Sequence, residues 1–275
     1  MGQLFPYGNA ILRAFHTFAI MNVGLVISLV VIVIGYIIFR KAFRTNKSNY
    51  IVPANTAQLL AENVAFYNNL GNDNKPLFEQ RVKDFLTNIA VRGVDTTIDD
   101  TDRVLVAAGA IIPIFAFPDW KYNNLAEVLL YKGTFNREYN TDGNDRNVLG
   151  MVGDGAMHRE MILSQPSLRA SFKNPTDGQN TAIHEFAHLI DKADGSTDGV
   201  PEYLLAHPYI TPWVARMHEI IKEMKERNRS DINLYGATND AEFFAVVSEY
   251  FFERPDELKE HHPELFEMLE QMFHT

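Results

Sequence analysis

The segment His184-Glu185-Phe186-Ala187-His188 has the pattern His-Glu-x-x-His and lies within a largely apolar stretch of the chain. On a helix, residues four apart lie one turn apart on the same face, so His184 and His188 can bind one cation together. Glu185 is rotated away from that line and can reach a water molecule bound to the cation. The pattern is typical of zinc hydrolases, in which an ion with one open position lowers the pKa of its water to about 7. The alternative is a chance match on a solvated helix face.

The residues around this pattern favour one amphipathic helix over residues 181–191. The apolar side chains that can pack inward are those of Ile183, Phe186, Ala187 and Ile190. The two histidines lie along another face of the same helix. Asn180 or Thr181 can cap the start of the helix, and Gly195 can end it. Asp191 follows His188 by three residues on the same face. We interpret it either as a carboxylate that orients a metal-bound histidine or as one partner of a salt bridge at the helix end.

The third ligand of such a site defines the class of hydrolase. The metzincin pattern requires glycine at position 191 and histidine at position 194, and this chain has Asp191 and Asp194. Asp194 is a weaker candidate ligand, because an aspartate at 191 disfavours the tight turn that glycine permits. A second helix over residues 239–252 is the better source. On it, Glu242 and Glu249 are seven apart and share a face, so the residues alone favour neither, and both can instead form salt bridges at the rim.

Beyond these motifs, the chain resembles the Mlc titration factor A family of zinc metallopeptidases over about residues 54–274. The most specific matches are the His-Glu-Phe-Ala-His segment followed by Asp191, and the run from Tyr235 through Ala241-Glu242 to Phe252. The chain departs from the family in two respects. It carries an N-terminal apolar segment, and the tyrosine of its Val-Leu-Leu-Tyr segment is followed by Lys132 in place of proline.

The resemblance implies a ligand set and a fold. It implies that Glu242 is the third metal ligand and that Tyr235 faces the metal and helps to stabilise the transition state. Glu249 is then either a carboxylate that contacts a ligand residue or a structural acid. It also implies one Zn²⁺ per chain and Glu185 as the general base. The fold class that we predict is α+β and mainly helical: a zincin-type, gluzincin-like metallopeptidase domain with a small β-sheet, preceded by one transmembrane helix.

Residues 19–39 form an apolar run, and no Lys, Arg, Asp or Glu falls between Arg13 and Arg40. As a helix the run is about 31 Å long, which is enough to cross a bilayer core of about 30 Å. A cleaved signal peptide is one alternative, but the run is too long for that and no cleavage site of small residues follows it. A buried core helix is another. We expect a retained transmembrane helix.

The charges that flank this run predict its orientation. Four basic residues follow it (Arg40, Lys41, Arg44 and Lys47), whereas Arg13 alone precedes it. The positive-inside rule therefore predicts a single-pass protein of the inner (cytoplasmic) membrane, with a short tail outside and the C-terminal domain facing the cytoplasm. We divide the chain into residues 1–44 as tail and membrane helix, 45–54 as linker, and 55–275 as the metallopeptidase domain.

The charge of the C-terminal part excludes one class of partner. The first 44 residues carry four basic and no acidic residues, so the rest carries 21 basic and 35 acidic residues, a formal net charge of −14. Binding to nucleic acid requires a basic surface, which this balance argues against. The chain has no cysteine, so disulfides and thiolate ligands are excluded.

Apolar spacing and turn residues outline the rest of the domain. Helical spacing covers residues 55–70, 75–90 and 100–117, and further helices begin near residues 179, 210, 238 and 262. Residues 125–135 and Met161-Ile162-Leu163 favour strands. Residues 136–155 between them are rich in Asn, Asp and Gly, and we predict a long hairpin loop there.

The residues and the resemblance together predict a membrane-anchored zinc peptidase acting on a peptide or protein substrate. The alternative is a regulatory binding protein, in which the domain sequesters a transcriptional repressor or another cytosolic partner and peptidase activity is weak or incidental. The sequence does not distinguish endopeptidase from exopeptidase activity.

Overall fold

The computed structural model describes residues 31, 33–35, 50–135, 149–153, 159–201, 203–204 and 207–274. The chain divides into two compact units, Met1–Thr45 and Asn46–Thr275. In the first unit, Val31 and residues 33–35 are helical, and the remainder of the predicted membrane span lies outside the described residues. No helix within the described ranges combines the length and the apolar character needed to cross a bilayer.

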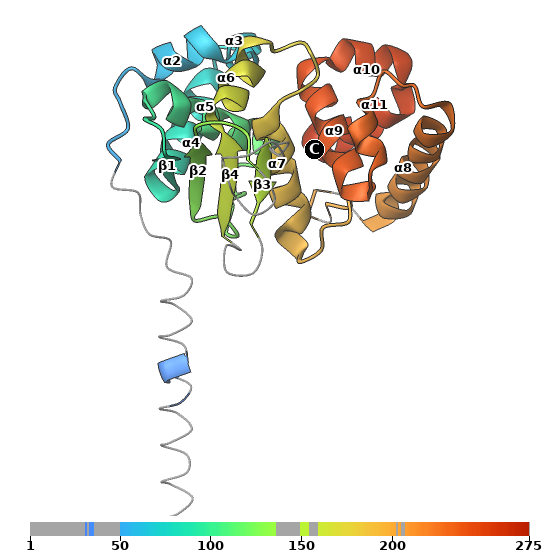
Figure 1. The fold of residues 1–275 in the computed structure, drawn as a ribbon, viewed down its shortest axis with the longest axis horizontal. Helices are drawn as coiled ribbons and strands as arrows, with labels where there is room; N and C mark the ends of the chain where they lie inside the picture. The colour runs from blue at the N-terminus through green and yellow to red at the C-terminus, as the bar shows by residue number, and fades with distance from the viewer. Residues whose placement is uncertain are drawn as a thin grey trace, which may run out of the picture. The chain divides into compact units, whose positions relative to one another are not determined.

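The second unit is mainly helical and contains one small sheet (Figure 1). Its helices are α2 (Thr56–Asn63), α3 (Ala65–Asn69), α4 (Asn74–Asn88), α5 (Asp100–Ile111), α6 (Gln165–Lys173), α7 (Thr181–Asp191), α8 (His207–Arg227), α9 (Asp240–Glu253), α10 (Pro255–His261) and α11 (Pro263–His274). Short 3₁₀ helices are η1 (Ile112–Ile114), η3 (Lys192–Asp194) and η4 (Leu234–Ala237). Its strands are β1 (Ala90–Val94), β2 (Glu127–Tyr131), β3 (Gly150–Val152) and β4 (Glu160–Ser164).

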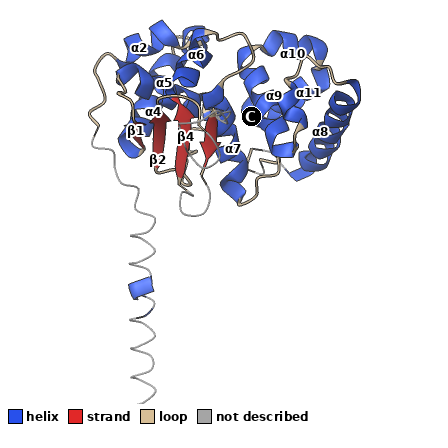
Figure 2. Ribbon diagram, in the orientation of Figure 1, coloured by secondary structure: helices blue, strands red, loops and turns tan. Residues whose placement is uncertain are grey.

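The sheet has the strand order β1-β2-β4-β3, as labelled in Figure 1, and its strands are drawn red in Figure 2. Strands β1, β2 and β4 are parallel, and β3 pairs antiparallel with β4, with Met151 opposite Ile162. Strand β3 therefore forms one edge of the sheet, and among the described residues its other side has no strand partner. Such an edge leaves backbone N–H and C=O groups available to another extended chain.

The long hairpin loop predicted for residues 136–155 is wrong. Strand β3 lies inside that range, and β2 and β4 are parallel neighbours, whereas a hairpin would make them antiparallel. The prediction failed because β3 has only three residues and begins with glycine, so its strand conformation depends on pairing with β4 rather than on local preference. The strands themselves are confirmed as β2 and β4, with shorter bounds for β2.

The predicted helices are largely confirmed, with interruptions that apolar spacing does not reveal. Residues 55–70 form two helices, α2 and α3, because Val64 adopts an extended backbone between them. Pro113 lies in η1 directly after α5, where it cannot donate to a continuing α-helix. Strand β1, directly after α4, was not predicted.

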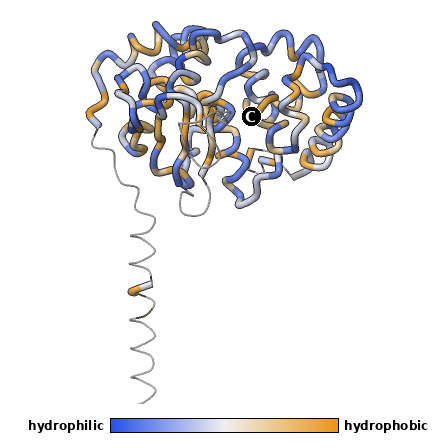
Figure 3. The backbone as a smooth tube through the Cα atoms, viewed as in Figure 1, coloured by the Kyte–Doolittle hydropathy of each residue, from blue (hydrophilic) through white to orange (hydrophobic). Residues whose placement is uncertain are grey.

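Helix α7 lies between the two halves of the domain. In Figure 1 the sheet and α2–α6 lie on one side of α7, and α8–α11 lie on the other. Buried side chains from both sides form one hydrophobic core that includes Phe186 of α7 and Phe243 of α9. The residues along the outer side of α8 are mainly hydrophilic, as expected for a helix that covers this core (Figure 3).

Both ends of α7 are determined by local chemistry. The side chain of Asn180 accepts a hydrogen bond from the backbone N–H of Ile183, which is the N-cap interaction. The helical segment continues from α7 through η3 and ends at Gly195, which has a left-handed backbone with φ of 106°. The predicted cap and stop are confirmed at these two residues, and they fix the histidine-bearing helix in place.

Candidate metal centre

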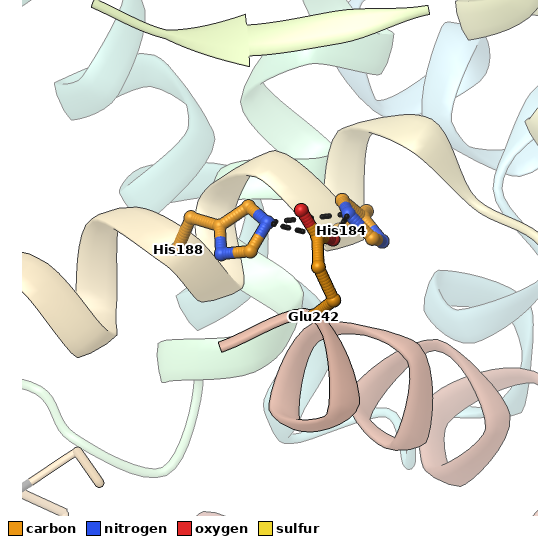
Figure 4. A group of neighbouring side chains, drawn as sticks. All are labelled: His184, His188 and Glu242. Carbon is orange, nitrogen blue, oxygen red and sulfur yellow. Dashed lines mark hydrogen bonds and ion pairs between the residues drawn. The ribbon is translucent and has the colours of Figure 1, made fainter. Parts of the chain in front are cut away.

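Three nitrogen and oxygen atoms from α7 and α9 converge on one point (Figure 4). Nε2 of His184 lies 3.0 Å from Oε2 of Glu242 and 3.2 Å from Nε2 of His188. Nε2 of His188 lies 3.4 Å from Oε2 of Glu242. Within the described part of the chain, these residues are the group of His, Asp and Glu side chains close enough to hold one ion. Asp194 does not belong to it.

The spacing of these three atoms fits a zinc ion. Zinc binds histidine nitrogen and carboxylate oxygen at about 2.0–2.2 Å, so neighbouring ligand atoms in a tetrahedral site lie about 3.3–3.6 Å apart. The observed separations of 3.0, 3.2 and 3.4 Å are within a few tenths of an ångström of that spacing. Two imidazoles and one carboxylate also form a donor set that zinc prefers, and three protein ligands leave a fourth position open.

The start of α9 carries the carboxylate of this group. The side chain of Asn239 accepts a hydrogen bond from the backbone N–H of Glu242 and so fixes the first turn of α9. Helices α7 and α9 pack directly against each other. This packing brings Glu242, which is 54 positions after His188 in the sequence, up to the two imidazoles.

Glu249 lies behind His184, on the far side of the ring from Glu242. Its Oε1 is 2.7 Å from Nδ1 of His184, and its Oε2 accepts a hydrogen bond from the backbone N–H of Asn180. A carboxylate at Nδ1 places the ring proton there and leaves Nε2 free to bind a cation. The structure thus separates two glutamates that the residues alone left equal.

The pKa values of these residues reflect their mutual contacts. Burial lowers the pKa of His184, but its hydrogen bonds to Glu242 and Glu249 outweigh burial and raise that pKa well above its ordinary value. Burial raises the pKa of Glu242, and its hydrogen bonds to His184 and His188 more than reverse this, so that pKa is lowered. Glu242 is therefore ionised at neutral pH, as a ligand carboxylate must be.

His188 has a different environment from His184. Its Nδ1 is buried and has no hydrogen-bond partner among the residues that the structure describes, and the same holds for Oδ1 of Asp191 one turn further along α7. The other oxygen of Asp191 accepts a hydrogen bond from the backbone N–H of Gly199 at 2.9 Å. Burial raises the pKa of the Asp191 carboxyl to about 6. Asp191 thus holds the loop after α7, and its free oxygen is not hydrogen-bonded to His188.

Glu185 lines the same cavity as the three converging atoms and lies next to strand β3. Its side chain is buried, and it lies against the backbone of Gly150. Burial raises the pKa of this carboxyl, although His184 and His188 lower it in part. The placement agrees with a group that accepts a proton beside the centre rather than one that binds the ion.

Tyr235 reaches the centre from η4, the 3₁₀ helix that precedes α9. Its hydroxyl donates to Oε1 of Glu242 at 3.2 Å, and its ring centre lies 6.0 Å from that of His184. The side chain is 53 % exposed, so the hydroxyl can also meet a molecule bound in front of the centre. Asn233 caps η4 by accepting from the backbone N–H of Tyr235.

A cavity of about 950 Å³ opens in front of the converging atoms. Strand β3 lines one side, and η4 with the start of α9 lines the other. The residues at α7 and η3 that line it are Thr181, His184, Glu185, His188 and Lys192. Its volume is sufficient for several residues of an extended peptide, and β3, an edge strand among the described residues, contributes to its lining.

Some features of this site were not visible in the sequence. The contact between Glu185 and Gly150 joins segments 35 positions apart, and Gly150 lies in a stretch whose composition suggested only a loop. Glu253, which binds the loop before α7, was also missed. Its spacing of four from Glu249 was the available signal, because it puts both carboxylates on one face of α9.

Two histidines on one helix, a glutamate from a second helix and an open sheet edge beside them are the arrangement of the two-histidine, one-glutamate class of metallopeptidases. Comparison with known proteins agrees. Residues 39–274 match the model of the glucose-regulated metallo-peptidase M90 family, and the chain belongs to that family.

Individual relatives support the same assignment. The uncharacterized protein slr2042 of Synechocystis is 27% identical over 233 residues, which is 81% of this chain and 84% of the relative. Mlc titration factor A of Escherichia fergusonii is 31% identical over 189 residues, covering 64% of this chain and 69% of the relative. The protein of that name from Pectobacterium atrosepticum is 27% identical over 179 residues, covering 59% and 64%. These matches confirm the resemblance to the Mlc titration factor A family.

Proposed function

We propose that this protein is a membrane-anchored, zinc-dependent peptidase that hydrolyses peptide bonds with Glu185 as the general base. One observation carries the proposal: three donor atoms at zinc spacing lie next to a buried carboxylate and an unpaired sheet edge. His184, His188 and Glu242 would hold one Zn²⁺ ion. When bound, the ion would acidify a water molecule and polarise the carbonyl of the substrate.

The residues of the chain supply the proton transfers. Glu185 would take a proton from the attacking water at its carboxylate and pass it to the nitrogen of the leaving amine. Its raised pKa favours this double role, because a carboxylate whose pKa lies nearer neutrality accepts a proton more readily than an ordinary one and can still release it. Tyr235 would donate from its hydroxyl to the oxyanion that develops on the substrate carbonyl.

Strand β3 would align the substrate. The backbone hydrogen bonds from Ser164 N–H to Leu149 C=O and from Gly153 N–H to Glu160 C=O show that the odd-numbered residues face β4. Groups alternate in an antiparallel pair, so the N–H and C=O groups of Gly150 and Val152 face the open edge. An extended peptide paired with these groups would lie along the cavity in front of Glu185.

The test combines metal analysis with cleavage. The purified protein should contain close to one zinc per chain and should cleave members of a peptide library. A chelator should abolish cleavage, and added zinc should restore it. Zinc-loaded protein that cleaves no member of the library would contradict the proposal, as would protein that binds no zinc.

The membrane anchor and its orientation are part of the proposal. They are supported by the apolar run over residues 19–39 and by the excess of basic residues after it. The domain would then face the cytoplasm from the inner membrane, and its substrates would be cytoplasmic peptides or proteins.

A regulatory binding protein is the second candidate function. It is favoured by the name of several relatives, Mlc titration factor A, because a titration factor acts by binding its target. In that case this domain would sequester a transcriptional regulator, and tethering would hold the regulator at the membrane. Variants that lack the ligand residues would separate the two functions, because a binding protein would retain its partner without them, whereas a peptidase would lose turnover.

A further inference from the structure

Glu185 and strand β3 approach each other too closely for a side chain at position 150. A Cβ atom added to Gly150 would lie 2.5 Å from Cγ and Oε1 of Glu185 and 2.7 Å from Cδ. Nonbonded carbon atoms pack at about 3.5–4.0 Å, so even a methyl group at this position would displace the carboxylate or the strand.

The backbone conformation does not account for the glycine. Gly178, Gly195 and Gly199 have positive φ angles, which explains glycine there, but Gly150 does not belong to this group. Gly150 is an ordinary strand residue opposite Leu163, where most side chains would be favoured over glycine. The requirement at this position is therefore space, and Glu185 occupies that space.

Neither partner in this contact can withdraw easily. Glu185 is 6 % exposed and projects from a helix that is largely buried, with Ile183 and Phe186 in the core. Strand β3 is held to β4 on both sides of Gly150, through Leu149 and Gly153. The carboxylate is thus confined between the histidine-bearing helix and the edge strand.

We propose that Gly150 is a positioning residue for the general base. Its missing side chain provides the space in which the Glu185 carboxylate is held against the edge strand. The same residue presents its N–H and C=O to the open edge, where a substrate peptide would pair. Gly150 would therefore position both the base and the backbone of the substrate. This inference rests on the proposed peptidase function, but the contact that it describes can be measured without activity.

The first experiment measures the contact in full-length protein stripped of metal. Gly150→Ala should lower Tm by about 3–10 °C, as expected for overpacking in a domain of this size. In a Glu185→Ala background the space is vacated, so the same substitution should change Tm by no more than about 1 °C. An equal loss of Tm in both backgrounds would overturn the proposal.

Gly109→Ala provides the matched control. A Cβ atom there would lie 2.5 Å from Cβ of Ala182, so the substitution also crowds α7, but from α5 and without touching Glu185. It should lower Tm equally in both backgrounds. If Gly150→Ala fails to fold, the double variant Gly150→Ala, Glu185→Ala decides: recovery of a folded protein supports the proposal, and failure to fold overturns it.

The second experiment measures catalysis in zinc-loaded protein. Gly150→Ala should retain one zinc per chain and an unchanged KM, while kcat falls about 10²-fold, because a displacement of the base by about 1 Å is costly. Unchanged kcat would contradict a positioning role. If the wild-type protein shows no cleavage at all, the proposed function fails, and the Tm measurements still decide whether Gly150 accommodates Glu185.

Discussion

At the scale of single residues, two glutamates on one helix have opposite relations to the same histidine. Glu242 faces Nε2 of His184, and Glu249 faces Nδ1. A ligand donates electrons to the ion directly, whereas a carboxylate behind the ring fixes the tautomer and the orientation of the ring. The two residues should therefore differ in what their loss does to metal binding.

We predict that Glu242→Ala strips zinc from the protein, as His184→Ala and His188→Ala do. Glu249→Ala should retain most of the zinc under excess metal, with an affinity reduced about 10- to 100-fold, the usual cost of losing a carboxylate behind a ligand histidine. Metal content after dialysis and competition with a chelator would measure both effects. If Glu249→Ala lost its zinc while Glu242→Ala kept it, the assignment of the two glutamates would be reversed.

A second prediction separates metal binding from proton transfer. Glu185→Gln preserves the size of the side chain and its contact with Gly150 but removes the base. Zinc content should stay near that of the wild type, while kcat falls by about 10²–10⁴-fold. Steady-state kinetics on zinc-replete protein measures this change. Full turnover in the variant would remove Glu185 from the mechanism.

At the scale of secondary-structure elements, α9 clamps the start of α7 with two carboxylates one turn apart. Glu249 accepts from the backbone N–H of Asn180, and Glu253 accepts from those of Gly178 and Gln179. Burial raises the pKa of Glu253 to about 7, and the negative charges of Asp177 and Glu249 contribute. The clamp therefore contains one carboxyl group that titrates near neutrality.

This clamp predicts a pH dependence of stability. An acid whose pKa is raised on folding favours the folded state at low pH, and this contribution is lost as pH rises through the folded pKa. Between pH 5 and pH 8, Tm of the wild type should therefore fall relative to that of Glu253→Gln, by an amount corresponding to about 1–3 kcal/mol. Thermal denaturation at several pH values measures it. Glu260→Gln, an exposed change on α10, is the control and should follow the wild type. A constant difference between wild type and Glu253→Gln would contradict the prediction.

The elements differ in how well the sequence predicts them. The difference depends on how far apart in the sequence the residues that determine each element lie. The bounds of α7 follow from its own residues, because Asn180 and Gly195 act within a few positions of the helix ends. The parallel pairing of β2 with β4 and the edge position of β3 depend on contacts between distant segments, which apolar spacing does not encode. The choice between Glu242 and Glu249 is of the second kind, since it depends on which turn of α9 lies against each nitrogen of His184.

At the scale of the whole molecule, we predict a topology that follows from the basic flank after residues 19–39. The full chain should sediment with membranes and resist extraction by carbonate. Protease added outside intact cells should leave the domain intact and remove at most the short N-terminal tail. Immunoblotting with an antibody against the domain measures both. Digestion of the domain from outside would reverse the orientation, and envelope proteins would then replace cytoplasmic ones as substrates.

The distance in sequence between the two histidines and Glu242 has a consequence for biosynthesis. The ribosome completes α7 at Asp191 and reaches the start of α9 at Asp240, 49 residues later. Until α9 has been made and has packed, a nascent chain offers two imidazoles without the proposed third ligand, so we expect it to hold zinc weakly. The proposed hydrolytic chemistry would thus become available only after α7 and α9 have packed together. Under the proposed function, a truncated product of interrupted translation would be inert, and a cell would be protected from fragments of its own peptidase.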